Sequence, residues 1–179
     1  KFLHENLKTA RMKKEWYLFA LCVEEIAIFG DKPHVEPADF DALIAEIPKY
    51  IESSTDNHKA CSMLTVFGLL GQKSLVPDAW LGILQHHLEY CMRCHVHPHS
   101  GLIMVFTLFN RKHLFDSAFW KMERDGLALN RCDNHWFLFA PKAAALTIAA
   151  ADQIDLQGFQ LMNKTLNTPV PIPQTRRFV

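Results

Sequence analysis

Residues 91–100, CMRCHVHPHS, place two cysteines and three histidines within ten positions. Thiolate and imidazole groups bind zinc well, and a Cys-x-x-Cys pair followed at once by histidines has a plausible zinc spacing. A local chelate in this stretch would use Cys94, His95, His97 and His99. Whether these four side chains converge depends on the elements that carry them.

The composition is that of a folded globular chain, since 49% of the 179 residues are hydrophobic and 21% are charged. This length suits one compact domain or a short array of repeats. The 19 basic and 19 acidic residues cancel, which does not favour a nucleic-acid binder. The five cysteines form no regular framework, so we expect reduced thiols. The longest apolar run, 101–109, is about half as long as a membrane span, and we expect none.

Apolar residues recur at the spacing of an α-helix along most of the chain. Stripes that begin with the spacing i, i+3, i+4 occur at 19–26, 40–51, 63–70 and 102–109. Strand-like alternation of apolar and polar residues is never sustained. The sequence therefore predicts an all-α fold.

The stripes repeat at an interval of about 40 residues, as in arrays of helical repeats. The stripe at 63–70 recurs at 102–109, and the helix openings PADF (37–40), PDAW (77–80) and DSAF (116–119) follow the same interval. One hairpin cannot bury both of its faces, so we expect stacked antiparallel hairpins in an α-solenoid-like domain. An irregular all-helical domain with two similar hairpins is the alternative.

The expected domain covers residues 1–166, and an extended tail follows over 167–179. The hairpins are predicted at about 2–30, 36–73, 77–113 and 116–151, with a final helix at 155–166. Three prolines at alternate positions exclude a helix from the tail, whose apolar and basic residues suit a segment that lies on a neighbouring protein. The candidate contact residues of the tail are Val170, Ile172, Arg176, Arg177 and Phe178.

The repeat gives the cysteine–histidine stretch a second interpretation. His58, His97 and His135 are separated by 39 and 38 residues and fall in the loops between the two helices of successive hairpins. The sibling loops, TDNH and RCDNH, hold one cysteine or none. Cys91 falls on a buried stripe, where a free cysteine behaves as a small hydrophobic residue. We therefore expect a turn with helix-capping histidines, without a bound metal or other cofactor.

The sequence His-Val-Glu at 34–36, followed by the Cys-x-x-Cys pair at 91–94, resembles the signature of zinc nucleoside deaminases. However, Tyr90 stands where that motif needs proline, and the deaminase fold needs strands alternating with helices. The sequence also lacks a glycine-rich phosphate loop and a Gly-x-Ser-x-Gly elbow. We therefore expect no enzyme activity and no small-molecule substrate, with a zinc deaminase as a remote alternative.

Charge is polarised along the chain, although it sums to zero. Residues 24–56 contain nine acidic residues against two lysines. In a stack of hairpins this block would form an acidic end that attracts a basic protein surface, and an ordinary solvated face is the alternative. The candidate partner-binding residues in the block are Glu36, Asp39, Asp41 and Glu46.

The paired segments DFDALIAEIPKYI with MLTVFGLLG, and AWLGILQHHLEYC with LIMVFTLFN, resemble the helical-hairpin repeats of organelles, namely the pentatricopeptide, octotricopeptide and related families. The similarity is one of pattern and period and covers most of residues 15–166. Many members of these families bind organellar RNA, and short members serve as accessory protein subunits. A pentatricopeptide-like subunit of the ATP synthase in some protist mitochondria is similar in size and plan.

The resemblance implies a non-catalytic scaffold or accessory subunit that binds other protein subunits of a large assembly, such as a mitochondrial ribosome, an RNA-processing complex or ATP synthase. It also implies a location in the mitochondrial matrix, and a start at Lys1 rather than at Met would suit removal of a targeting segment. An organellar RNA-binding repeat protein is the alternative, which the neutral charge does not favour.

Overall fold

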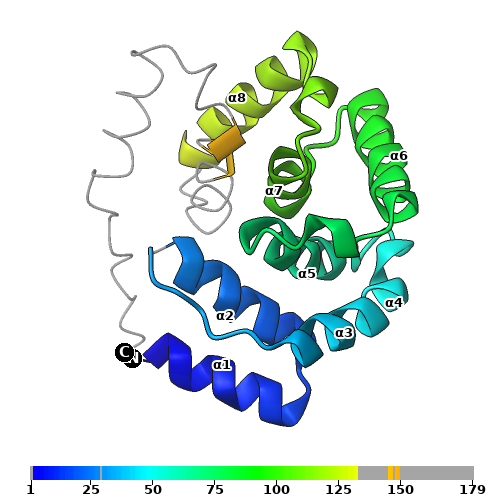
Figure 1. Ribbon diagram of the computed structural model, residues 1–179. Helices are drawn as coiled ribbons and strands as arrows, with labels where there is room; N and C mark the ends of the chain where they lie inside the picture. The colour runs from blue at the N-terminus through cyan, green and yellow to red at the C-terminus, as the bar shows by residue number, and fades with distance from the viewer. Residues whose placement is uncertain (1, 29, 133–144, 147, 150–179) are drawn as a thin grey trace, which may run out of the picture.

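The computed structural model describes residues 2–28, 30–132, 145–146 and 148–149 (Figure 1). Every regular element in these ranges is helical and no strand occurs in them, which confirms the predicted all-α class for this part of the chain. None of its helices is both long and apolar enough to cross a membrane. In chain order the elements are α1 (Phe2–Lys13), α2 (Trp16–Ile28), α3 (Pro37–Glu46), α4 (Pro48–Ile51), α5 (Asn57–Leu69), the 3-10 helix η1 (Lys73–Leu75), α6 (Asp78–Cys94), α7 (Ser100–Leu108), the 3-10 helix η2 (Lys112–Leu114) and α8 (Ser117–Cys132).

Helices α5 and α7 form the centre of the molecule, and Figure 1 shows the other helices arranged around them. Nine of the 13 residues of α5 and six of the nine residues of α7 are buried. The stripe at 63–70 predicts one buried face for α5, but the helix packs against α2, α4 and α7 and is buried on several sides. The buried hydroxyls of Thr65 and Thr107 are satisfied because each donates to the carbonyl one turn earlier, at 2.9 and 2.7 Å.

Helices α5 and α7 lie side by side and run in the same direction. At their C-terminal ends, a β-carbon added to Gly68 would lie only 2.7 Å from the Cβ of Leu108. Toward their N-terminal ends, a β-carbon added to Gly101 would lie 3.1 Å from the Cβ of Cys61. Each helix therefore places a side chain where the other helix has a glycine, and this exchange brings the two backbones close together.

The turns that follow α5 and α7 have the same geometry. Gly71 and Asn110 adopt the left-handed conformation, with φ of 72° and 60°. In both turns the next residue donates its N–H to a carbonyl five residues back, that of Phe67 at 2.8 Å and that of Phe106 at 2.7 Å, as in a Schellman motif. Each turn leads into a three-residue 3-10 helix, η1 or η2. Phe67 and Phe106, which lie 39 residues apart, are both fully buried.

The stripe at 40–51 predicts one continuous helix, but the structure divides this segment into two helices at a proline. Helix α3 ends at Glu46, and α4 begins at Pro48, which has no N–H to continue the hydrogen bonding of α3. The apolar side of the segment is nevertheless maintained, because Ile47 and Ile51 are both buried. The predicted final helix at 155–166 and the tail at 167–179 lie outside the described residues.

Arg11 joins α1 to the beginning of α3. Its Nε and one terminal nitrogen donate to the two carboxylate oxygens of Asp39, at 2.9 and 2.7 Å, and the same terminal nitrogen donates to the carbonyl of His34 at 2.6 Å. Asp39 also accepts the backbone N–H of Glu36 at 2.8 Å and is buried. Asp39, one of the candidate partner-binding residues, therefore uses its charge inside the chain.

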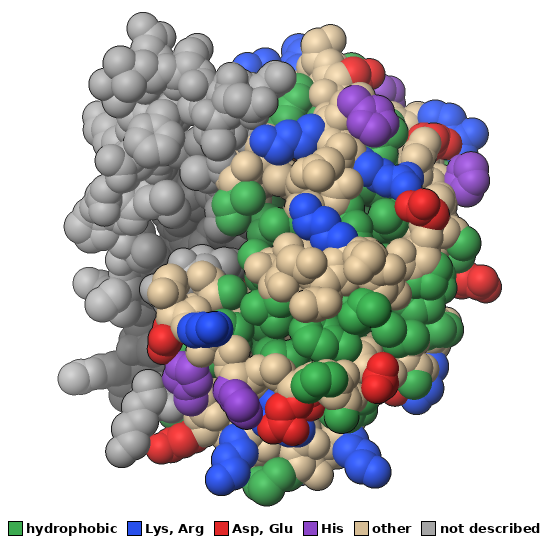
Figure 2. Space-filling model, viewed as in Figure 1, with side chains coloured by type: hydrophobic (Ala, Val, Ile, Leu, Met, Phe, Trp, Pro, Cys, Tyr) green, Lys and Arg blue, Asp and Glu red, His purple; other side chains and the backbone are tan. Residues whose placement is uncertain are grey.

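The surface is mixed in character. Figure 2 shows hydrophobic side chains gathered in a band across the middle of one face, over α3 and α5, with charged side chains mainly above and below it. Several large apolar residues are strongly exposed, and the described ones include Phe2, Met12, Leu18, Leu75, Tyr90 and Val96.

Truncating either central phenylalanine should destabilise the fold. We expect Phe67→Ala and Phe106→Ala each to lower the free energy of unfolding by about 3–5 kcal/mol, because both rings are fully buried. Phe2→Ala is the matched control, since that ring is 73% exposed and its loss should cost less than about 0.5 kcal/mol. Urea denaturation measures all three, and an unchanged midpoint for either buried position would show that α5 and α7 are not central.

Candidate functional site

The cysteine–histidine stretch forms the loop of residues 95–99 between α6 and α7, which we call the histidine loop. It begins where α6 ends, because His95 adopts a left-handed conformation with φ of 54°. The next amide, of Val96, donates to the carbonyl of Cys91 at 2.9 Å and closes the helix end. Cys94 and His95 are both exposed at this end. The two remaining histidines of the loop contact different neighbours.

His97 holds the histidine loop against α8. Its Nδ1 lies 3.0 Å from a carboxylate oxygen of Glu123, whose side chain is fully buried. The imidazole ring also lies directly over Gly126, one turn further along α8, where an added β-carbon would overlap the ring. Glycine at this position therefore makes room for His97, and the hydrogen bond with Glu123 fixes its orientation.

His99 is the N-cap of α7 and contacts α5. Its Nδ1 accepts the backbone N–H of Leu102 at 3.2 Å, so the neutral ring carries its proton on Nε2. That Nε2 lies 3.9 Å from the sulfur of Cys61 on α5. The expected role of a helix-capping histidine is therefore found at His99. A histidine cap is unusual, since serine, threonine, aspartate and asparagine lead at this position.

Three imidazoles, two from helices and one from the histidine loop, lie near one another, and we call His58, His87 and His99 the histidine cluster. The ring centroid of His99 lies 6.4 Å from that of His58 on α5 and 6.5 Å from that of His87 on α6. His87 also lies near a thiol, with 3.7 Å between its Nε2 and the sulfur of Cys91. Tyr17 of α2 meets the edge of His58 at 5.7 Å between centroids.

The ring that contacts His58 is not that of its equivalent in the next loop. The repeat interval makes His58 and His97 equivalent positions, whereas the contact of His58 is with His99. The reason is that α7 begins only at Ser100, after Pro98, so the last residue of the histidine loop occupies the place beside α5. His135 lies outside the described residues.

Burial dominates the electrostatics of the cluster. It lowers the pKa of His99 to about 4, with smaller contributions from His87 and His58, and it also lowers the pKa of His87. The pKa of the Cys61 thiol is raised by burial and, to a lesser degree, by Glu24 of α2. Glu24 itself has its pKa raised to about 7, first by burial and then by Glu25. Near neutral pH this region therefore contains a neutral capping imidazole and a protonated thiol.

The loop does not gather the four candidate zinc ligands. Cys94 and His95 are exposed at the end of α6, whereas His97 contacts α8 and His99 contacts α5. In the described ranges, no group of three histidine, cysteine or acidic side chains is placed to hold a metal ion. His34, the first residue of the deaminase-like motif, has its Nε2 3.3 Å from a carboxylate oxygen of Glu36.

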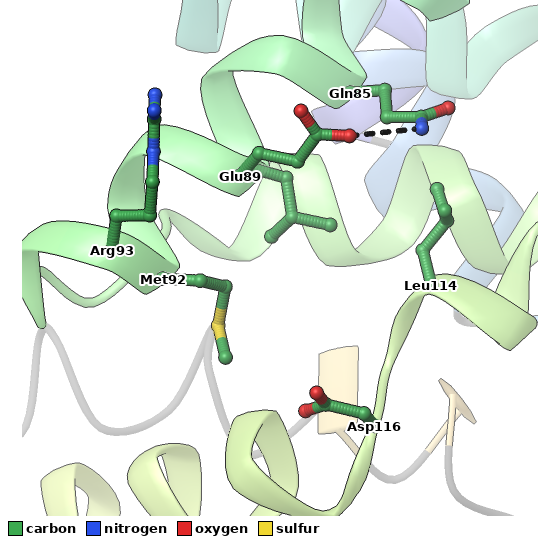
Figure 3. A pocket seen from close by; sticks show the side chains of 7 residues that line it. Gln85, Glu89, Met92, Arg93, Leu114 and Asp116 are labelled. Atoms are coloured by element: carbon green, nitrogen blue, oxygen red, sulfur yellow. Dashed lines mark hydrogen bonds between the residues drawn. The ribbon is translucent and has the colours of Figure 1, made fainter.

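A pocket of about 390 Å³ lies between α6 and the segment from η2 to α8 (Figure 3). Leu88, Met92 and Leu114 form its apolar part. Its polar lining comes from Gln85, Glu89, Arg93 and Asp116, and the Gln85 amide donates to Glu89 at 3.0 Å. No motif marks this pocket in the sequence. The only signal is the spacing of four residues, which aligns 85, 89 and 93 along one side of α6.

Some of the candidate acidic residues already have partners within the chain, so only part of the predicted acidic surface is free to contact another protein. Asp41 is exposed on α3, and Glu36 is half-exposed but paired with Arg11 at 3.3 Å. Glu46 accepts hydrogen bonds from Lys49 at 2.6 Å and from the Tyr50 hydroxyl at 3.1 Å. The candidate tail residues Val170, Ile172, Arg176, Arg177 and Phe178 lie outside the described residues.

Removal of His97 should destabilise the protein more than removal of an exposed histidine. His97→Ala takes a hydrogen-bond partner from a fully buried carboxylate, and we expect a loss of about 2 kcal/mol in the free energy of unfolding. His86→Ala is the control, because its contact with Glu89 is solvent-exposed and worth less than about 0.5 kcal/mol. Chemical denaturation at pH 7 provides both values. Equal losses for the two variants would mean that His97 does not dock the loop on α8.

Comparison with known proteins adds no family to this description. No known family model matches the sequence, no curated protein is detectably similar to it, and no solved structure matches the fold.

Proposed function

We propose that this chain is a non-catalytic scaffold, built from stacked helical hairpins, that binds other protein subunits in a large mitochondrial assembly. The observation that carries the proposal is the recurrence of one structural unit at α5 and α7. Both helices run in the same direction, and each ends in the same left-handed turn and 3-10 helix. Such a recurrence is typical of arrays in which each unit packs only on its neighbours.

The order of packing is consistent with a stack. Helix α2 packs on α1 and α5, and α5 packs in turn on α7, so helices that are distant in sequence form successive inner layers. Helices α3, α4 and α6 lie outside the row formed by α2, α5 and α7 (Figure 1). This is the position expected for the first helices of the proposed hairpins. A stack of this kind presents long outer surfaces and two ends, which suits contacts with several proteins.

The chemistry of the surface favours protein partners over nucleic acid. Tyr90 and Val96 are each more than half exposed near the end of α6, and Leu75 is exposed on η1. Tyrosine is one of the residues that most often anchor protein interfaces, and exposed apolar neighbours such as Val96 extend the area that a partner can cover. The formal net charge of zero leaves few cations for phosphate, whose neutralisation drives nucleic-acid binding. The location in the mitochondrial matrix and the type of assembly rest on the resemblance to organellar repeats.

The segment 167–179 is the proposed anchor. Its sequence combines apolar residues with the pair Arg176 and Arg177, and it adds no helical stripe to the domain. We expect deletion of residues 168–179 to leave the helical circular dichroism and the melting temperature unchanged while reducing recovery of the parent assembly. The double variant Arg176→Ala/Arg177→Ala should show part of this loss of recovery. The control is Lys121→Ala, which changes an exposed side chain of α8 and should not reduce recovery.

The measurement is quantitative mass spectrometry of proteins captured by the tagged chain from mitochondria, with and without ribonuclease. Capture of a defined set of subunits that survives ribonuclease and depends on the tail supports the proposal. Sub-micromolar, sequence-selective RNA binding at physiological salt would contradict it and favour an RNA-binding repeat protein. Equal capture by the truncated chain would show that the tail is not an anchor.

A further inference from the structure

Two histidines of the histidine loop, which lie two residues apart, contact helices on opposite sides of the loop. His97 contacts Glu123 on α8, whereas His99 lies against α5 and α6. The backbone at His99 is extended, with φ of −71° and ψ of 154°, so alternate side chains of the loop point to opposite sides. The loop therefore holds α8 on one side and the N-terminal ends of α5 and α7 on the other.

Protonation has different effects on the hydrogen bonds of the two histidines. His99 accepts the N–H of Leu102 through Nδ1, and only a neutral imidazole has a nitrogen that can accept. A protonated His99 would point an N–H at another N–H, so the cap of α7 would be lost. His97 faces a carboxylate, and a protonated ring still donates to it. A proton therefore breaks the contact on one side of the loop and leaves the other intact.

Among the described residues, no acidic side chain is paired with His99. The carboxylates that act on the thiols near it are Glu24 of α2, on Cys61, and Glu123 of α8, on Cys91. Helix α5 contributes His58 and Cys61, and α6 contributes His87 and Cys91. Burial raises the pKa of both thiols, which stay protonated in acid.

Helix α2 contributes Tyr17, beside His58, and Glu24, whose charge acts on Cys61. The raised pKa of Glu24, about 7, means that this carboxyl is already neutral when His99 titrates. The N-terminal contact between α5 and α7 also includes the tight approach of Gly101 to Cys61.

We propose that the histidine loop is an acid-released clasp, in which protonation of His99 frees the loop and the first turn of α7 from α5 and α6 while His97 keeps the loop on α8. The pKa of His99 is lowered in the folded protein, to about 4 from an ordinary value of 6.5. The contribution of this cap to stability is therefore fully present above pH 6.5 and is lost as pH falls through about 4. Release uncovers Cys61, which is otherwise fully buried.

The test compares the full chain with His99→Asn, because asparagine is a good N-cap and does not titrate. Cys61 is labelled with 4,4′-dithiodipyridine, which reacts with thiols in acid, and the mixed disulfide is located by peptide mass spectrometry. In the unmodified chain, we expect the labelling rate of Cys61 relative to exposed Cys94 to rise about tenfold or more from pH 6.5 to 4, as the local opening becomes favourable. In His99→Asn the ratio should stay nearly constant.

A graded variant and a control complete the experiment. His58→Gln removes one of the groups that lower the pKa of His99, so release should move to higher pH. His86→Asn changes an exposed histidine of α6 outside the cluster and should leave the profile unchanged. If His99→Asn does not fold, His99→Ser provides the same non-titrating cap. The proposal is overturned if the non-titrating variant follows the acid profile of the unmodified chain, or if Cys61 stays protected at pH 4.

Discussion

Helices α5 and α7 approach closely because each places a side chain against a glycine of the other, Leu108 on Gly68 and Cys61 on Gly101. Two contacts of this kind, one near each end, keep the helices side by side and in the same direction. The core then forms around them, since α2 and α4 pack on α5 and both central phenylalanines are fully buried. A bulkier residue at either glycine would have to push the helices apart, and protein interiors yield little.

This arrangement also explains where the unusual polar groups lie. Helices that run in the same direction bring their N-terminal ends together, and these ends carry unsatisfied N–H groups with partial positive charge. His58 and His99 both lie there, and His87 joins them from α6. A neutral imidazole accepts an N–H at such an end, as His99 does from Leu102, whereas a cation is disfavoured. Helix capping and packing thus account for the positions of His97 and His99 in the cysteine–histidine stretch.

The sequence predicts the helical class and several buried positions because apolar periodicity reports directly on burial. It also predicts that CMRCHVHPHS contains a turn, since Pro98 and the interval between loops both indicate one. It does not predict that His58 meets His99, because that contact depends on where α7 begins. Nor does it predict the burial of Asp39, because counting charges cannot show that Arg11 reaches it from 28 positions away. The pocket along α6 is missed for a similar reason, since Leu114 and Asp116 reach it from a separate segment.

The free energy of unfolding of Gly68→Ala tests the central packing most directly. Alanine normally stabilises a helix by about 1 kcal/mol over glycine, and we expect that gain at Gly82 of α6, where no atom lies near an added β-carbon. At Gly68 the new carbon meets the Cβ of Leu108, and we expect a loss of about 1–3 kcal/mol instead. A gain at Gly68 equal to that at Gly82 would contradict the close packing of α5 on α7.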